Sequence, residues 1–194
     1  MVHTPTDQNG HDCVGRLIER LDVAVASESV RARCRAIKEV LSGATRGRLH
    51  LDAHFLEVRD EGYARRLLHR DPEGRYSIVV MVWDKGQSTP IHDHDGTWCV
   101  ECVYDGTIKV TSFDMVETGN DGKTRFVEAE EVYAGIGEAG ALIPPFEYHV
   151  ISNPAQHPAV TVHVYGGELK GCHAFEPDGE GHWVRRWHDS WYDN

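Results

Sequence analysis

The chain has 194 residues, with 20 Lys and Arg against 31 Asp and Glu, which give a formal net charge of -11. This length suits one domain, because typical domains run from about 100 to 200 residues. The negative charge excludes nucleic acid and anionic membrane surfaces as main partners, since both would repel the chain.

The N-terminal residues 1–12 are polar and lack the apolar region of a secretory signal. The longest apolar run, Ile78 to Trp83, is far shorter than the ~20 residues that a membrane span requires. Five cysteines form an odd set without the spacing of a disulfide framework, so reduced thiols are expected. These features predict a cytoplasmic protein.

Two amphipathic helices are expected between residues 13 and 42. Apolar residues recur at helical spacing over residues 14–25 and, after a polar stretch, over residues 30–41. Gly43 is the expected C-cap of the second helix.

From about residue 63 the chain becomes a series of short β-rich runs separated by Gly, Pro, Asp and Asn. The runs are RYSIVVMVW, WCVECVYDG, TIKVTSFDM, GALIPPF, HVISN and AVTVHVYGG. They predict a mainly β protein, a barrel or a sandwich, over residues 59–194. The N-terminal helical segment, residues 1–58, is expected to pack on it within a single structural domain.

Three histidines stand at metal-ligand spacing. His92 and His94 are separated by one residue in an expected strand, so their side chains point to one face and Asp93 to the other. His149 follows a Pro-Pro turn, from which a neighbouring strand could bring it to the same centre. Several buried imidazoles without a ligand would leave polar groups unsatisfied, so a metal bound by these three residues is expected.

The histidines lie in two motifs that resemble those of the cupin superfamily. The first motif is Gly, HxH, Glu and Gly at fixed spacing, and its matches are Gly86, His92, His94 and Gly106. Cys99 stands where that motif has its Glu. The second motif is matched by Pro144, His149 and Asn153. The resemblance implies a cupin β-barrel, which is jelly-roll-like.

Within the cupins, Cys99 in place of the Glu is similar to the cysteine dioxygenase family, in which three histidines bind ferrous iron without a carboxylate. Thr161, His163 and Tyr165 share one face of a strand, where that family has a Ser, His, Tyr array near the substrate. The resemblance covers about residues 60–176, and it implies that these four residues are catalytic.

Upstream, Tyr63 and Arg65 share one face of a segment that resembles the strand with which the family binds the substrate carboxylate. The resemblance implies a non-haem Fe(II) enzyme that uses O2 to oxidise a small carboxylate-bearing thiol to its sulfinic acid. L-Cysteine is the favoured substrate, because relatives that oxidise 3-mercaptopropionate commonly have Gln in place of Arg65. Mercaptosuccinate stays open, and its second carboxylate would need Arg66, Lys170 or His173.

In animal members of the family a thioether joins the two residues that correspond to Cys99 and Tyr165, whereas the bacterial relatives usually have Gly at the first position. Because this chain has the Cys, the link is expected to accumulate with turnover, and an inert buried thiol is the alternative.

Two functions of other classes also fit the histidine pattern, namely a zinc or manganese isomerase and a cupin that binds a ligand without catalysis. Oxygen uptake with a panel of thiols would separate them. A monomer or small homo-oligomer is expected, and no chemistry can be read from the Trp-rich tail after residue 174.

Overall fold

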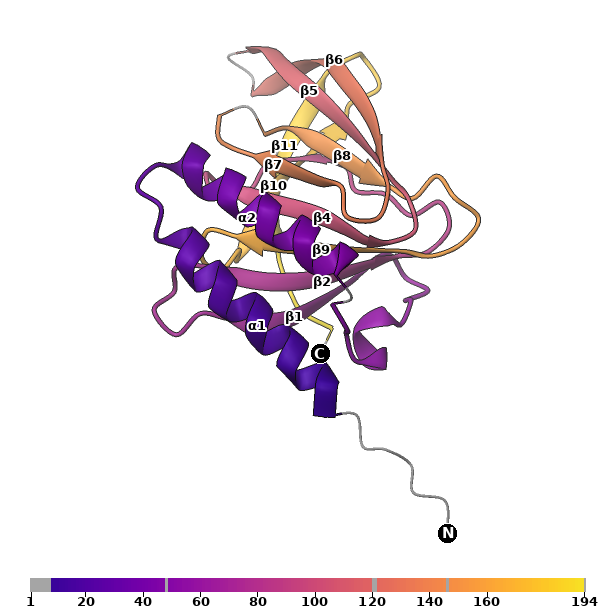
Figure 1. The fold of residues 1–194 in the computed structure, drawn as a ribbon. Helices are drawn as coiled ribbons and strands as arrows, with labels where there is room; N and C mark the ends of the chain where they lie inside the picture. The colour runs from indigo at the N-terminus through magenta and orange to yellow at the C-terminus, as the bar shows by residue number, and fades with distance from the viewer. Residues whose placement is uncertain (1–7, 48, 120–121, 146, 194) are drawn as a thin grey trace.

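The computed structural model of the chain describes residues 8–47, 49–119, 122–145 and 147–193 (Figure 1). Two α-helices, α1 (Gln8–Val25) and α2 (Val30–Arg46), precede a short 3-10 helix, η1 (Ala53–Leu56), and a long series of strands. No helix in the described ranges has both the length and the apolar composition needed to cross a lipid bilayer.

Helix α2 ends one turn later than expected. It runs to Arg46 and is capped by Gly47, whose N–H donates to the carbonyl of Gly43. The prediction that Gly43 ends the helix is therefore wrong. An internal glycine costs a helix only about 1 kcal/mol, and Thr45, whose hydroxyl lies 3.5 Å from the Sγ of Cys102, holds the last turn against the sheet.

The strands form two antiparallel sets. The first is an open sheet in the order β1 (Ala64–Arg70), β2 (Ser77–Trp83), β9 (Ala159–Tyr165), β4 (Cys99–Asp105) and β7 (Ala139–Leu142). The second closes on itself in the order β10 (Gly171–Pro177), β11 (Trp183–Asp189), β6 (Lys123–Ala134), β5 (Ile108–Thr118), β8 (His149–Ser152) and β3 (Ile91–His92). The predicted mainly β, jelly-roll-like barrel with N-terminal helices is confirmed, although the predicted runs did not include β6, β10 or β11.

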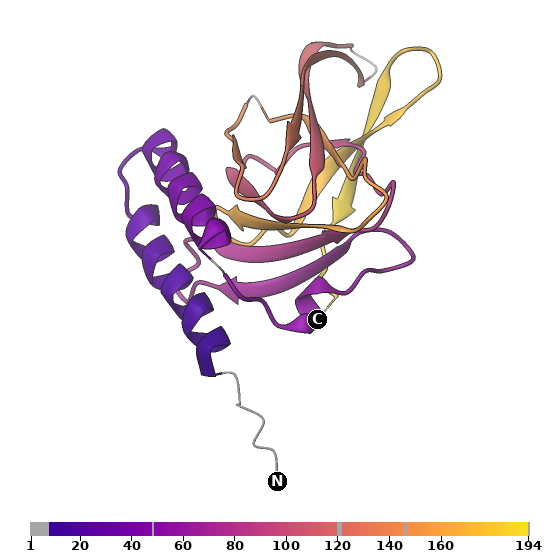
Figure 2. The same cartoon turned by 45° about the vertical axis from the view of Figure 1, so that its right-hand side comes forward.

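The open sheet is covered on both faces. Helices α1 and α2 lie against one face, and the second set of strands lies on the other side (Figure 2). On β2, Ile78 and Val80 pack against the helices, whereas Val79 and Met81 face the interior. Because both of its faces are buried, β2 is apolar from Ile78 to Trp83 instead of alternating with polar residues.

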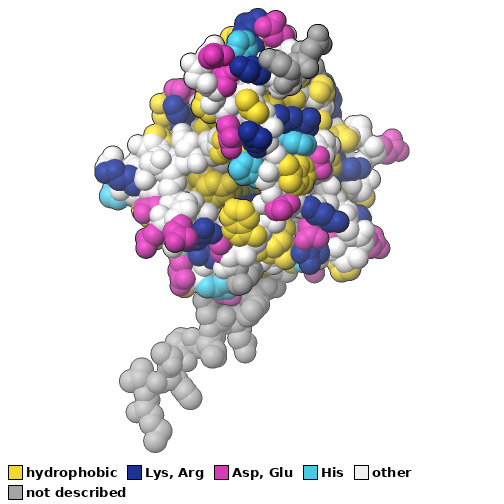
Figure 3. All heavy atoms as spheres, turned by 180° about the vertical axis from the view of Figure 1, so that it is seen from behind, with side chains coloured by type: hydrophobic (Ala, Val, Ile, Leu, Met, Phe, Trp, Pro, Cys, Tyr) yellow, Lys and Arg dark blue, Asp and Glu magenta, His cyan; other side chains and the backbone are white. Residues whose placement is uncertain are grey.

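The surface on the side away from the viewer of Figure 1 carries charges of both signs. Lys and Arg side chains are interspersed with Asp and Glu side chains, and histidine and hydrophobic side chains gather near the centre of this face (Figure 3).

The helical segment contributes a large part of the core, so its packing can be tested by stability. Leu21 of α1 is 0% exposed, and Leu21→Ala should lower the free energy of unfolding by about 2–5 kcal/mol. Val23 on the same helix is 77% exposed, and Val23→Ala should change it by less than about 0.5 kcal/mol. Urea unfolding followed by circular dichroism measures both variants. Equal stabilities would show that the helix is not part of the cooperative core.

Candidate metal centre

Three imidazoles meet inside the barrel. The nitrogen atoms that His92, His94 and His149 offer as ligands all lie within 4.8 Å of one another. His92 on β3 and His149 on β8 face each other as a cross-strand pair, with ring centroids 4.3 Å apart. The convergence expected from the sequence is therefore present in the fold.

His94 reaches this centre from a turn and not from a strand. The expected strand ends at His92, so the prediction that it continues through His94 is wrong in this detail. The carboxylate of Asp93 accepts the backbone N–H groups of Asp95 and His173, and Asp95 has a left-handed backbone with φ of 51°. The chain turns after His94, while Asp93 is directed away from the imidazoles toward β10.

Hydrogen bonds orient the rings for metal binding. The Nδ1–H of His149 donates to the carbonyl of Glu147 at 2.8 Å, and the Nδ1–H of His92 donates to that of Pro90 at 3.1 Å. The Nδ1 of His94 lies 3.5 Å from a carboxylate oxygen of Glu147. With the Nδ1 atoms of His92 and His149 used in this way, their Nε2 atoms remain as ligands, which is the usual arrangement around metal-binding histidines. The Nδ1 of His94 has no hydrogen-bond partner among the described residues.

Burial keeps these imidazoles in the form that binds metal. It lowers the pKa of His92 and pushes the pKa values of His94 and His149 well below the ordinary value. The Nε2 of His149 is buried without a hydrogen-bond partner among the described residues. Three neutral nitrogen donors, one of them orphaned, fit a divalent metal such as iron or zinc.

Arg65 of β1 is buried beside the centre with an unused donor. Its Nη1 donates to the carbonyl of Trp191 at 3.1 Å, but its Nη2 has no hydrogen-bond partner among the described residues. Its Cζ lies 5.7 Å from the ring centroid of Tyr165. Tyr63, just before β1, packs on Trp83 with ring centroids 4.7 Å apart. A buried guanidinium with a free N–H can bind an anion.

The three cations considered for a second carboxylate do not join Arg65 in this arrangement. Arg66 lies on the opposite side of β1 and donates to the carbonyl of Glu57 at 2.7 Å. His173 is hydrogen-bonded to Asp93, and Lys170 is exposed. Arg65 is thus the buried cation of this group that has a free donor.

The C-terminal tail supports Arg65, a role that the sequence did not reveal. The carboxylate of Asp193 accepts the backbone N–H of Arg65 at 2.7 Å and pairs with Arg59. The ring centroid of Tyr192 lies 5.2 Å from the Cζ of Arg65. Trp191, which belongs to the same tail, borders a cavity of about 220 Å³ beside Arg65. In the sequence, the one signal of this supporting role was the cluster of aromatic residues next to an acidic residue in the tail.

The inner face of β9 carries the predicted polar array. The Oγ1 of Thr161 accepts the indole N–H of Trp83 at 2.9 Å and lies 2.7 Å from the Nε2 of His163. The Nδ1 of His163 lies 3.5 Å from the hydroxyl of Tyr165. Burial lowers the pKa of His163 to about 3 and raises that of Tyr165 well above its ordinary value, so both groups are neutral at physiological pH.

Cys99 of β4 is 0% exposed and lies opposite Tyr165 in the strand register. Its Sγ lies 3.9 Å from the Nδ1 of His163, and burial raises the pKa of the thiol well above its usual value. Glu101, two residues further on, lies opposite His163 on the same face, and sequence reasoning missed it. Its signal was the strand alternation, which places Glu101 on the side of Cys99.

Sequence comparisons with known proteins point to one family. Residues 37–178 match the family described as Cysteine dioxygenase type I. Cysteine dioxygenase type 1 of Rattus norvegicus is 24% identical over 115 residues, which cover 59% of this chain and 56% of the rat protein. That of Danio rerio is 26% identical over 127 residues, which cover 63% and 60%. The chain thus matches less than two thirds of the length of these relatives.

Among solved structures, a cupin 2 conserved barrel domain protein from Salinispora arenicola is 17% identical, with a TM-score of 0.42. The similarity covers 60% of this chain and 84% of that chain.

The convergence of the imidazoles predicts their contribution to metal binding. We expect His149→Ala to weaken the binding of ferrous iron by at least about 100-fold, because one of three ligands is lost. The measurement is iron per chain by mass spectrometry of the metal after anaerobic loading and desalting. His157→Ala, on an exposed loop, should retain as much iron as the parent protein. Parental iron content in His149→Ala would contradict the assignment.

Proposed function

Because this chain belongs to the cysteine dioxygenase type I family, we propose that it is a non-haem iron thiol dioxygenase. One observation carries the proposal: three imidazoles at ligand distance share the barrel interior with a buried arginine that has an unused donor. His92, His94 and His149 would hold Fe(II), and Arg65 would bind the carboxylate of the thiol. The product is the sulfinic acid that forms when both atoms of O2 are added.

Fe(II) on three neutral nitrogen ligands would supply an uncompensated dipositive charge that favours an anionic thiolate and brings the sulfur close to dioxygen. The protein contributes position. Arg65 on β1 and the histidines on β3 and β8 approach from different strands, so a short thiol with a carboxylate can be held at both ends.

Tyr165 is proposed to hold the substrate from the side of the polar array on β9. Because burial raises the pKa of its hydroxyl, the phenol stays neutral and donates a hydrogen bond to a bound anion instead of repelling it. His163 and Thr161 fix the phenol from behind, and Thr161 is in turn fixed by the indole N–H of Trp83. The four side chains thus form one oriented set of donors and acceptors.

L-Cysteine is the favoured substrate. Arg65 favours a carboxylate at the position where relatives that use 3-mercaptopropionate commonly have Gln. Mercaptosuccinate would need a second cation, yet Arg66 and His173 have other partners and Arg59 is paired with Asp193. A thiol with one carboxylate therefore fits these contacts best.

A zinc or manganese isomerase and a non-catalytic ligand-binding cupin remain alternatives with the same histidines. Neither explains why Cys99 and Tyr165 stand opposite each other beside the histidine cluster. An oxygen electrode with cysteine, 3-mercaptopropionate, mercaptosuccinate and cysteamine decides the class. Thiol-dependent oxygen uptake by the iron-loaded protein supports a dioxygenase, and its absence with every thiol would exclude one.

The role of Arg65 can be tested by comparing two arginine variants of β1. Arg65→Ala should lower kcat/KM for cysteine by about 100- to 1000-fold, because a buried charge-assisted contact is lost. Cysteamine, which lacks the carboxylate, should be a poor substrate for both proteins. Arg70→Ala removes an exposed arginine of the same strand and should stay within about threefold of the parent. Equal use of cysteine and cysteamine by the parent would sink the carboxylate assignment.

The pairing of Cys99 with Tyr165 predicts a thioether between the sulfur and the ring carbon beside the hydroxyl. Its formation removes one S–H and one C–H hydrogen, and two electrons and two protons pass to dioxygen. After turnover with iron and cysteine, peptide mass spectrometry should find the linked pair two hydrogens lighter than the separate peptides.

Cys102 is the internal control for this test, since it lies on the helix-facing side of the same strand and should remain alkylatable after unfolding. Full alkylation of Cys99 in protein that has turned over would rule out the link and leave the iron assignment intact.

A further inference from the structure

A second cavity, distinct from the histidine centre, lies between the open sheet and the β5–β6 hairpin. It measures about 360 Å³, within the size range of small-molecule sites. Its inner walls are apolar and include Val103, Ile108, Leu142 and Ile151. None of the three histidines that form the metal centre borders it. The cavity is therefore open to a ligand of its own.

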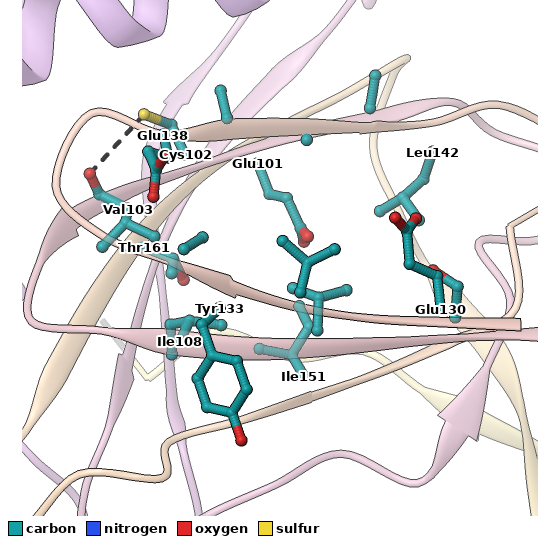
Figure 4. Close-up of a pocket in the computed structure, with 17 residues that line it drawn as sticks. Glu101, Cys102, Val103, Ile108, Glu130, Tyr133, Glu138, Leu142, Ile151 and Thr161 are labelled. Atoms are coloured by element: carbon teal, nitrogen blue, oxygen red, sulfur yellow. Dashed lines mark hydrogen bonds between the residues drawn. The ribbon is translucent and has the colours of Figure 1, made fainter. Parts of the chain in front are cut away.

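One acidic side chain extends into this apolar space. Glu101 hangs from β4 between the two layers of strands, with Ile108 and Ile151 on the opposite wall (Figure 4). The residue is 8% exposed, and its Oε2 has no hydrogen-bond partner among the described residues. Buried carboxyl groups normally have a partner, because leaving one unpaired costs free energy. Something outside the described side chains is needed to satisfy Glu101.

His163, the titratable side chain beside Glu101, does not supply that hydrogen-bond partner. The Nδ1 of His163 lies 3.7 Å from the Oε2 of Glu101, beyond hydrogen-bond distance. Because burial keeps the imidazole neutral, no ion pair forms between the two groups. The Nδ1 also lies closer, at 3.5 Å, to the hydroxyl of Tyr165. Glu101 is thus left facing the cavity.

The charge around the cavity selects the sign of a ligand. Glu130 and Glu138 add two more carboxylates to its lining, and no Lys, Arg or His is among the described residues that border it. An anionic thiol would be repelled here, whereas it is attracted to Arg65. A cation would satisfy Glu101, and an apolar body would cover Ile108 and Ile151.

We propose that this cavity is a binding site for a small amphipathic amine, with its ammonium group on Glu101 and its hydrocarbon part against Val103, Ile108 and Ile151. Burial raises the pKa of Glu101 to about 7, and a bound ammonium ion would favour the charged carboxylate. Neither the three histidines nor Arg65 lines the site, although Thr161 borders it from β9.

The test compares three probes of equal length on the iron-loaded protein kept free of oxygen and at pH 8: hexylammonium, hexan-1-ol and hexanoate. Isothermal titration calorimetry should give hexylammonium a Kd of about 1 mM or tighter. Hexan-1-ol should bind at least tenfold more weakly, and hexanoate should not bind. Methyl NMR should show shifts at Ile108 and Ile151 but not at Ile37 in the helical layer.

Three variants then separate charge from volume. Glu101→Gln should weaken hexylammonium at least tenfold while leaving hexan-1-ol unchanged. Ala134→Leu, which fills the cavity, should weaken both probes. Glu130→Gln at the exposed rim is the matched control and should change the Kd less than about twofold, because exposed charges are screened.

Two results would overturn the proposal. One is equal affinity of the parent protein for hexylammonium and hexan-1-ol, which would mean that Glu101 is merely a protonated acid in an apolar void. The other is hexylammonium binding that leaves the methyl signals of Ile108 and Ile151 unmoved. Both are measured on the parent protein, so the outcome holds even where a variant fails to fold.

Discussion

The burial of both faces of the open sheet is the constraint on which the rest of the structure depends. The helices cover one face, and the second set of strands covers the other. Strand alternation then assigns each side chain of β9 to one of two environments, because consecutive residues point to opposite faces. Val162 and Val164 pack toward the helices, whereas Thr161, His163 and Tyr165 face the interior. A polar side chain on the inner face has little access to water and must be satisfied by a neighbour or by a ligand.

The interior accordingly contains two kinds of polar group: those with a hydrogen-bond partner on a neighbouring side chain and those left for a ligand. Thr161 has a short contact with His163 and accepts the indole N–H of Trp83, so that part of the interior is internally satisfied. The Nε2 of His149 and the Nη2 of Arg65 are buried without a hydrogen-bond partner among the described residues. Since each such atom costs free energy, their positions mark where a metal and an anion would repay that cost. The histidines and the arginine approach from different strands, so the sheet geometry fixes the separation between metal and anion.

The sequence predicted much of this site, because its signals were local. The HxH spacing and the position of His149 predicted three converging imidazoles, and alternation predicted the array on β9. The strand through His94 was wrong because the hydrogen bonds of Asp93 to the next elements end it early. The role of the tail depends on a contact between Asp193 and Arg65, 128 residues apart, which no local pattern encodes. For Glu101, strand alternation predicts that the side chain points inward, but it cannot predict that none of the described residues offers its Oε2 a hydrogen bond.

Arg65 and Glu101 lie on different strands of the open sheet, and each has one polar atom without a hydrogen-bond partner among the described residues. Two strands, β2 and β9, separate β1, which carries Arg65, from β4, which carries Glu101, so the two strand backbones are roughly 14 Å apart at about 4.8 Å per strand. At an effective dielectric constant of about 20, charges at that distance interact by about 1 kcal/mol. A thiol carboxylate bound to Arg65, as proposed, would therefore feel a modest repulsion from an ionised Glu101. An ammonium ion bound to Glu101 would cancel it, so the two ligands would favour each other's binding although they share no contact.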